Sequence, residues 1–207
     1  MDKTVIDVET IDLIGNEILN NNKIAELTKK AMSGGINYKN SIIERTKILK
    51  GISIKDIEQT AKKIKITKGV IEVIKTLNYH GCHTMLISGG YEIFANVVGK
   101  KIGFKEIISN KPASKNGMLT GELKGKIIDG KGKLNCLKKR VKVLNLKKIQ
   151  TLAIGDGQND IDMISYANIG IAWKGYPKVK KIADVLLNYN FKSVLYFQGY
   201  SDKDIKI

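Results

Sequence analysis

The chain has 207 residues, of which 43% are hydrophobic, so it is long enough for one substantial core and a small accessory module. No apolar run approaches the roughly 20 residues of a membrane-spanning helix, and the first residues do not resemble a secretion signal. Two cysteines, Cys82 and Cys136, are too few for a disulfide framework. We therefore expect a reduced, cytoplasmic protein with no membrane partner.

The formal net charge of +16 comes almost entirely from lysine, because Arg45 and Arg140 are the only two arginines. The lysines occur singly or in pairs with few aromatic residues between them. A nucleic-acid interface favours arginine for its planar, bidentate side chain, so we expect no nucleic-acid partner. A basic surface also attracts dianionic small molecules, and we prefer that interpretation of the charge.

The first third of the chain predicts a small helical bundle without strands. Apolar residues recur at helical spacing in four stretches, which are 11–18, 24–31, 42–49 and 57–64. Asparagine, serine and glycine residues separate these stretches, and Ser53 can cap the last helix. We assign residues 11–66 to this helical unit.

From Gly69 onward, apolar runs alternate with helical stretches, and glycines in 112–129 suggest a hairpin. Strands are predicted at 84–87, near 107–108, and at 151–154, 169–173 and 185–187. This alternation predicts an α/β fold, a Rossmann-like parallel sheet with helices on both faces. We expect residues 1–10 and 67–207 to form this core, with 11–66 inserted as a helical cap.

Two glycine-rich polar turns follow apolar runs, where the chemistry of a parallel sheet gathers. In the turn at 155–160, Asp156 and Asp160 offer the carboxylate oxygens that Mg²⁺ prefers, although an acidic turn with a helix cap would look similar. The turn Ser88-Gly89-Gly90 offers a hydroxyl and bare amides to an anion at a helix N-terminus, and could also be only a cap.

The first residues carry a resemblance to a known family. Met1-Asp2-Lys3-Thr4 is similar to the end of Asp-x-Asp-x-Thr, the phosphate-transfer signature of the haloacid dehalogenase superfamily. The stretches 87–91 and 155–161 resemble its second and fourth motifs, and Lys131-Gly132-Lys133 falls where its third-motif lysine belongs. The family's lysine is commonly followed by glycine, so Lys131 is preferred, with Lys133 as the alternative. The resemblance covers nearly the whole chain.

Within the superfamily, the helical insert resembles that of phosphoserine phosphatases. These place a glutamate seven residues after the second aspartate, which is Glu9 here, and an arginine that corresponds to Arg45. The resemblance implies that Glu9 binds the substrate ammonium and Arg45 its carboxylate, while Met32 and Tyr38 shield the site. An arginine at this position is notable in a chain so rich in lysine, because its planar side chain can bind a carboxylate with two hydrogen bonds. The alternative is that Arg45 forms a surface pair with Ser41.

The resemblance also implies a mechanism through an aspartyl-phosphate. Asp2 is expected to be the general acid and base, and its backbone carbonyl and Asp156 to hold Mg²⁺. Asn159 and Asp160 would order the metal's waters. Ser88, the Gly89 amide and Lys131 would bind the phosphoryl oxygens.

The attacking aspartate of the motif would lie immediately before Met1, and the first central strand of the sheet would lie upstream as well. Lys3 also departs from the small residue of the family. We expect a polypeptide that begins at Met1 to be poorly folded and inactive, because burying three to five apolar side chains contributes roughly 5–15 kcal/mol. A start assigned too late is the preferred explanation, and a true pseudoenzyme the alternative.

The resemblance implies that the full-length parent hydrolyses O-phospho-L-serine to L-serine and phosphate, the last step of serine biosynthesis. Three alternatives stay open: a phosphatase for another small phosphomonoester, a phosphotransferase, and a protein that binds phosphoserine without turnover. Oligomeric state is not given by the sequence, and a homodimer stays open.

Overall fold

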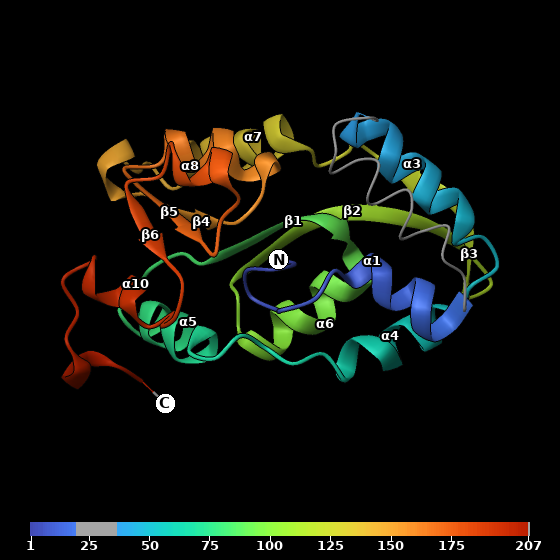
Figure 1. Cartoon of the computed structure of the whole chain (residues 1–207), viewed down its shortest axis with the longest axis horizontal. Helices are drawn as coiled ribbons and strands as arrows, with labels where there is room; N and C mark the ends of the chain where they lie inside the picture. The colour runs from blue at the N-terminus through green and yellow to red at the C-terminus, as the bar shows by residue number, and fades with distance from the viewer. Residues whose placement is uncertain (20–36, 207) are drawn as a thin grey trace.

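The computed structural model describes residues 1–19 and 37–206, in which two three-stranded sheets lie side by side (Figure 1). In the first sheet β1 (Met85–Tyr91) is parallel to β2 (Glu106–Lys115), and β3 (Met118–Lys124) returns antiparallel to β2. In the second, β4 (Leu152–Gly155), β5 (Ile169–Trp173) and β6 (Val185–Leu187) are all parallel. The predicted α/β class with parallel strands is confirmed.

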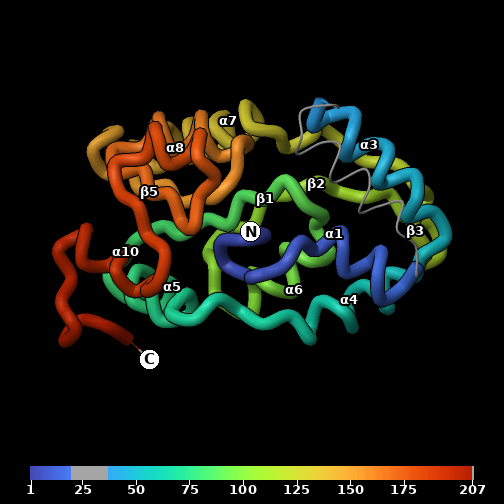
Figure 2. Tube along the Cα trace, viewed as in Figure 1, coloured from blue at the N-terminus to red at the C-terminus, as the bar shows by residue number. Residues whose placement is uncertain are grey.

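Helices cover both faces of the sheets, as predicted (Figures 1 and 2). On one side lie α5 (Val70–Tyr79), α6 (Glu92–Ile102) and α10 (Ser193–Tyr196). On the other lie α7 (Gly130–Val143) and α8 (Ile161–Tyr166). The remaining short helices are α9 (Pro177–Lys180) and the 3₁₀ turns η2 (Lys148–Gln150), η3 (Gln158–Asp160) and η4 (Asp202–Asp204). Apolar side chains such as Phe94 and Ile171 are fully buried between these layers.

The predicted cap region is helical where it is described. It contains α1 (Thr10–Leu13), the π-helix η1 (Ile14–Leu19), α3 (Tyr38–Ile48) and α4 (Ile54–Lys62). Asn37 caps α3 by accepting the Lys39 amide. Ser53 occupies the N-cap position of α4 as predicted, but its side chain makes no capping hydrogen bond. The predicted stretch 24–31 and Met32 lie outside the described residues, and the boundaries of the cap stay a prediction.

The predicted hairpin is present, and it begins earlier than expected. Asn116 and Gly117 both have positive φ angles of 52° and 78°, which is the geometry of a two-residue type I′ turn. The strand predicted near 107–108 therefore continues as the ten-residue β2 into this hairpin, and α3 packs against β3. Within the described residues no helix is both long and apolar enough to cross a bilayer.

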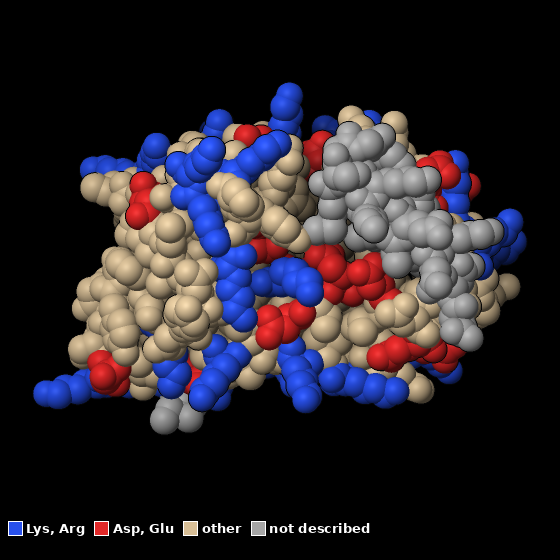
Figure 3. Space-filling model, viewed as in Figure 1, with Lys and Arg blue, Asp and Glu red and all other residues tan. Residues whose placement is uncertain are grey.

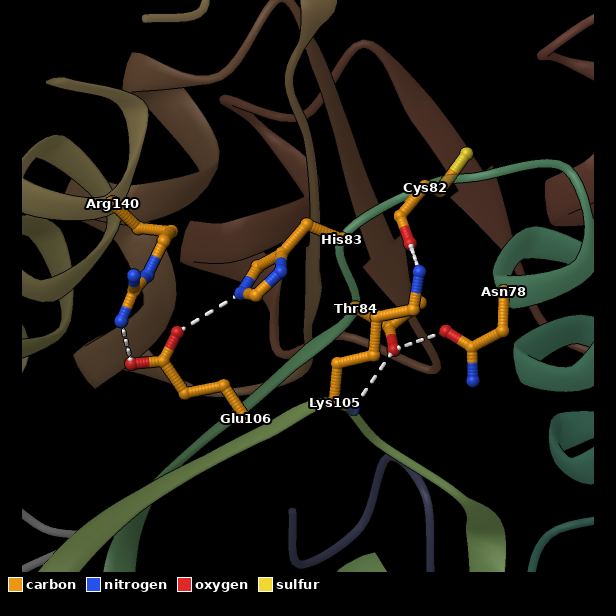
Figure 4. A network of polar contacts seen from close by, with 7 residues as sticks. All are labelled: Asn78, Cys82, His83, Thr84, Lys105, Glu106 and Arg140. Carbon is orange, nitrogen blue, oxygen red and sulfur yellow. Dashed lines mark hydrogen bonds and ion pairs between the residues drawn. The ribbon is translucent and has the colours of Figure 1, made fainter. Parts of the chain in front are cut away.

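A polar network joins the amino ends of β1 and β2 to α7 (Figure 4). Glu106 accepts hydrogen bonds from Arg140 and, at 3.0 Å, from His83. Thr84 donates to Asn78 at 2.8 Å and accepts the Lys105 amide at 3.2 Å. Burial alone would raise the pKa of Glu106, but the bonds from Arg140 and His83 outweigh it, so this pKa lies below its ordinary value.

Candidate active site

A cavity of about 1170 Å³ opens where β1 and β4 end, and it brings together eleven of the residues that the sequence predicted. They come from the N-terminal segment, α3, the end of β1, the start of α7 and the turn after β4. The cavity is lined by Asp2, Glu9, Tyr38, Arg45, Ser88, Gly89, Lys131, Lys133, Asp156, Asn159 and Asp160. Of the predicted site residues, Met32 alone lies outside the described part of the chain.

Asp2 is held in one orientation by Thr10. The Thr10 amide and hydroxyl donate to Asp2 Oδ2 at 2.9 Å and 2.8 Å. The other carboxylate oxygen, Oδ1, is buried and has no hydrogen-bond partner among the described residues. Buried polar atoms are nearly always paired, so Oδ1 is available to a ligand in the cavity.

The turn after β4 places two more carboxylates beside Asp2. Asp156 Oδ1 accepts the Thr4 hydroxyl at 2.8 Å, and Asp160 Oδ2 accepts the amides of Asp156 and Gly157. Burial and the neighbouring Asp160 raise the pKa of Asp156. Burial would also raise the pKa of Asp160, but the adjacent Lys133 ammonium lowers it overall. The site therefore carries negative charge that its own residues neutralise only in part.

This donor set fits a hard divalent cation. Within the described residues, no three His, Cys, Asp or Glu side chains gather as a ligand set. A cation here would therefore take one or two carboxylates, a backbone oxygen and waters, which is the coordination that Mg²⁺ prefers. The raised pKa of Asp156 marks a carboxylate whose ionised form such a cation would stabilise.

Lys133 is the lysine nearest to the carboxylates. Its ammonium lies 2.6 Å from Asp160 Oδ1, and both side chains are almost fully buried, whereas Lys131 is exposed. Asp129 caps α7 by accepting the Gly132 amide at 2.7 Å, which sets Lys133 within the first helical turn. Both lysines line the cavity, so the choice between Lys131 and Lys133 as the phosphate lysine stays a prediction.

Ser88 and Gly89 lie within β1, not in a turn at a helix N-terminus as predicted. The strand runs on to Tyr91 with an irregular register after Ile87, because its backbone bonds to β2 resume only at Tyr91. Ser88 is 2% exposed and its hydroxyl accepts the Gly90 amide at 3.0 Å. A side chain at Gly89 would overlap the Tyr38 hydroxyl, so the close approach of α3 requires glycine here.

Glu9 and Arg45 lie on the same cavity, and no described residue forms an ion pair with either. Arg45 is 8% exposed, and its Nε donates to the Ser41 carbonyl at 3.3 Å, so it is buried and not part of a surface pair. Burial, together with Asp2 and Asp156, raises the pKa of Glu9 to about 7. A guanidinium and a carboxyl group that form no ion pair within the described residues suit a zwitterionic ligand.

Two residues that position the site, Thr10 and Asn110, were missed from sequence, and Thr4 was noted only as part of the first motif. Thr4 and Thr10 orient Asp156 and Asp2, and Asn110 joins β2 to the cavity wall. Asn110 donates to the Gly89 carbonyl and accepts the Ile128 amide, both at 2.7 Å. Its position directly after the apolar run of β2 is the one sequence signal that pointed to it.

The charge distribution sets this site apart from the rest of the surface. Figure 3 shows acidic side chains gathered near the middle of one face, with Lys and Arg side chains spread around them. On this face, the lysines and arginines that contribute to the formal net charge of +16 therefore lie around a group of acidic side chains. Such a basic field attracts an anion toward the acidic site.

Comparisons with known proteins agree with this geometry. Residues 1–165 match the family model of haloacid dehalogenase-like hydrolases. The chain is 34% identical over 186 residues to the phosphoserine phosphatase of Methanocaldococcus jannaschii, covering 90% of this chain and 88% of that protein. It is similar to a solved substrate-bound phosphoserine phosphatase (TM-score 0.87, 32% identity, 95% of this chain and 94% of that one). It is also similar to a solved phospho-aspartyl intermediate analogue of phosphoserine phosphatase (TM-score 0.86, 32% identity, 95% of each chain).

Proposed function

This chain belongs to the haloacid dehalogenase-like hydrolase family, and we propose that its site hydrolyses O-phospho-L-serine to L-serine and phosphate. One observation carries the proposal: a single cavity combines carboxylates and a buried lysine near the strand ends with Glu9 and Arg45, neither of which forms an ion pair within the described residues. The first set suits a phosphoryl group, and the second suits the ammonium and carboxylate of an amino acid. Relatives over most of the chain's length are phosphoserine phosphatases, which supports the same substrate.

The proposed roles follow from these contacts. Asp2 is the general acid and base, because Thr10 fixes one of its oxygens and leaves Oδ1 free to exchange a proton with the leaving oxygen or a water. Ser88, the Gly89 amide and Lys133 bind the phosphoryl oxygens. A positioned cation and hydrogen-bond donors supply most of the catalysis of phosphoryl transfer.

The substrate's amino-acid part is assigned to the other wall. Arg45 binds the carboxylate with its planar fork, and Glu9 binds the ammonium. Tyr38, whose hydroxyl donates to the Gly89 carbonyl, closes the cavity between the two walls, and Met32 is proposed to help it.

Mg²⁺ is the cofactor that we propose. The Asp2 carbonyl and Asp156 would hold it, with Asn159 and Asp160 ordering its waters. When bound, it would neutralise charge on the phosphoryl group. We also propose a cytoplasmic location and a place in serine biosynthesis, for which the two free thiols, Cys82 and Cys136, and the relatives named above are the support.

The attacking carboxylate is proposed to belong to a residue joined directly to the amino group of Met1. That amino group is buried, and the charges of Lys133, Asp2, Asp160 and Asp156 all act on it. A residue attached there would place its side chain among the groups that line the cavity. Each phosphoryl transfer to this carboxylate would then be followed by hydrolysis with Asp2 as the base.

The experiment compares Arg45→Lys with Lys47→Ala, an exposed position on the same helix, in protein that carries an aspartate before Met1. Loss of a bidentate charged contact is worth about 1.5–3 kcal/mol, so kcat/KM for phosphoserine should fall by roughly 10- to 100-fold. Hydrolysis of p-nitrophenyl phosphate, which has no amino-acid part, should not change in either variant. Equal losses on both substrates would contradict the assignment and favour another small phosphomonoester.

A further inference from the structure

Two hydrogen bonds join α3 to the end of β1, one near each end of the helix. Tyr38, the first residue of α3, donates its hydroxyl proton to the Gly89 carbonyl. In the last turn of α3, the Thr46 hydroxyl lies 2.9 Å from the hydroxyl of Tyr91, the last residue of β1. The two contacts are about 12 Å apart along the helix at 1.5 Å per residue, so they fix both of its ends against the strand.

The direction of the second bond follows from the other contact of Thr46. Its hydroxyl has one proton, which it donates to the Ile42 carbonyl at 2.6 Å, so Tyr91 is the donor to Thr46. The side chains of Thr46 and Tyr91 are buried, at 1% and 2% exposed, and burial raises the pKa of Tyr91 to about 12. The phenol therefore keeps this proton, and the bond persists, at neutral pH.

Arg45 lies between these two bonds and has few contacts of its own. Its Nε donates to the Ser41 carbonyl, which belongs to the same helix, and no other described residue accepts a hydrogen bond from its guanidinium. The charge of Arg45 acts to lower the pKa of the Tyr38 and Tyr91 phenols, against the larger effect of burial, so the guanidinium lies near both. Its place in the cavity therefore follows the placement of α3 as a whole.

The remaining contacts of α3 hold it less precisely. The helix packs against β3, and its Ile42 is buried (Figure 1). Apolar contacts have no direction and allow small shifts of a helix, whereas a hydrogen bond weakens steeply as its geometry departs from the ideal. Thr46 directly follows Arg45 in the chain, so the bond from Tyr91 fixes the helical turn that carries the guanidinium.

We propose that the Tyr91 hydroxyl is a positioning group for the substrate carboxylate, because it holds Thr46 and thereby directs Arg45 into the cavity. Tyr91 acts on the carboxylate only through α3 and Arg45. This role rests on the proposed function, in which Arg45 binds the carboxylate of the amino acid. It would make β1, which also carries Ser88 and Gly89, the strand that positions both the phosphoryl contacts and the carboxylate contact.

The test measures Tyr91→Phe in protein that carries an apolar strand ending in aspartate before Met1. A contact that is weakened equally in the ground state and the transition state raises KM and leaves kcat unchanged. We expect KM for phosphoserine to rise by roughly 3- to 10-fold, the size of one net hydrogen bond, while kcat changes by less than about twofold. Phosphoethanolamine has the phosphate and ammonium but no carboxylate, so its kcat/KM should change by less than about twofold.

Variants of the acceptor check that the hydrogen bond itself is responsible. Thr46→Val removes the acceptor and should raise KM for phosphoserine as Tyr91→Phe does, whereas Thr46→Ser keeps the hydroxyl and should preserve KM. The matched control is Thr76→Val in α5, because Thr76 is also fully buried and also donates to the carbonyl four residues earlier. This control should leave kcat and KM unchanged for both substrates.

A double variant separates positioning from a purely structural role. In Arg45→Lys the bidentate contact is already lost, so adding Tyr91→Phe should change KM for phosphoserine by less than about twofold. An unchanged KM in Tyr91→Phe alone, or an equal rise with and without Arg45, would overturn the proposal. A parent protein that hydrolyses phosphoethanolamine as well as phosphoserine would instead overturn the proposed function, and with it the carboxylate role of Arg45.

Discussion

At the scale of single residues, the site depends on charged side chains that are buried. Lys133 and Asp160 form an ion pair in the interior, while burial and neighbouring carboxylates raise the pKa of both Asp156 and Glu9. The free protein therefore holds a site that is strained by its own charge and that a cation and a zwitterionic substrate relieve.

Replacing Lys133 tests which lysine serves the site. Lys133→Met leaves Asp160 buried without a partner, so the free energy of unfolding should fall by about 3–5 kcal/mol, and inorganic phosphate should no longer bind. Lys131→Met, at an exposed position two residues away, should change stability by less than about 0.5 kcal/mol. Urea unfolding and phosphate titration measure both. A larger effect of Lys131→Met on phosphate binding would restore Lys131 as the phosphate lysine.

The raised pKa of Glu9 makes a prediction about pH. Its carboxyl is neutral below about pH 7 and ionised above it in the free protein, and only the ionised form attracts an ammonium. In protein with an aspartate before Met1, kcat/KM for phosphoserine should therefore fall as pH drops below about 7. The Glu9→Gln variant should have a lower kcat/KM than the parent at high pH. As pH drops below about 7, the ratio of the two values, variant to parent, should rise toward one. A ratio that is independent of pH would show that Glu9 does not act on the ammonium.

At the scale of elements, the network around Glu106 fixes the amino ends of β1 and β2 against α7 (Figure 4). The folded-state pKa of Glu106 is lowered, so its contribution to stability is present above its ordinary pKa of 4.5 and is lost as pH falls through the folded value. Arg140→Met removes its principal partner. The variant should be less stable than the parent at pH 7, and this difference should shrink as pH falls below about 4.5.

Thermal unfolding from pH 7 to pH 3 measures that difference, with Lys142→Met in the same helix as a control. Lys142 lies two residues from Arg140 and is exposed. A gap between parent and Arg140→Met that stays constant with pH would mean that the arginine acts through packing alone.

The elements also show what sequence patterns can and cannot predict. Helical spacing and apolar runs located the parallel strands, because burial on both faces makes each strand a continuous apolar run. They did not locate the end of β1, since Ser88-Gly89-Gly90 looks like a turn and the strand continues past it to pair with β2 again at Tyr91. Which of Lys131 and Lys133 faces the site depends on the residue at which α7 begins, and the structure places that start directly after the Asp129 cap. Residue spacing alone does not fix this start to within two positions. Asn110 acts through contacts with distant segments, so its position after an apolar run does not by itself predict its role.

At the scale of the whole molecule, the two three-stranded sheets meet at one acidic cavity, which is surrounded by a basic surface. The strand ends of both sheets line one part of the cavity, and the helices at the N-terminal end of the chain line another. The proposed phosphate side and the proposed amino-acid side of the site therefore come from different parts of the fold.

The most direct measurement is phosphate release from phosphoserine with Mg²⁺, comparing residues 1–207 with the same polypeptide preceded by an apolar strand that ends in aspartate. Turnover of the extended protein is expected in the ordinary range of about 1–10³ per second. The polypeptide that begins at Met1 should be slower by roughly 10⁵- to 10⁶-fold, the loss seen when a nucleophile is removed. Equal, rapid turnover by both would contradict the assignment of the nucleophile and, with it, the central claim.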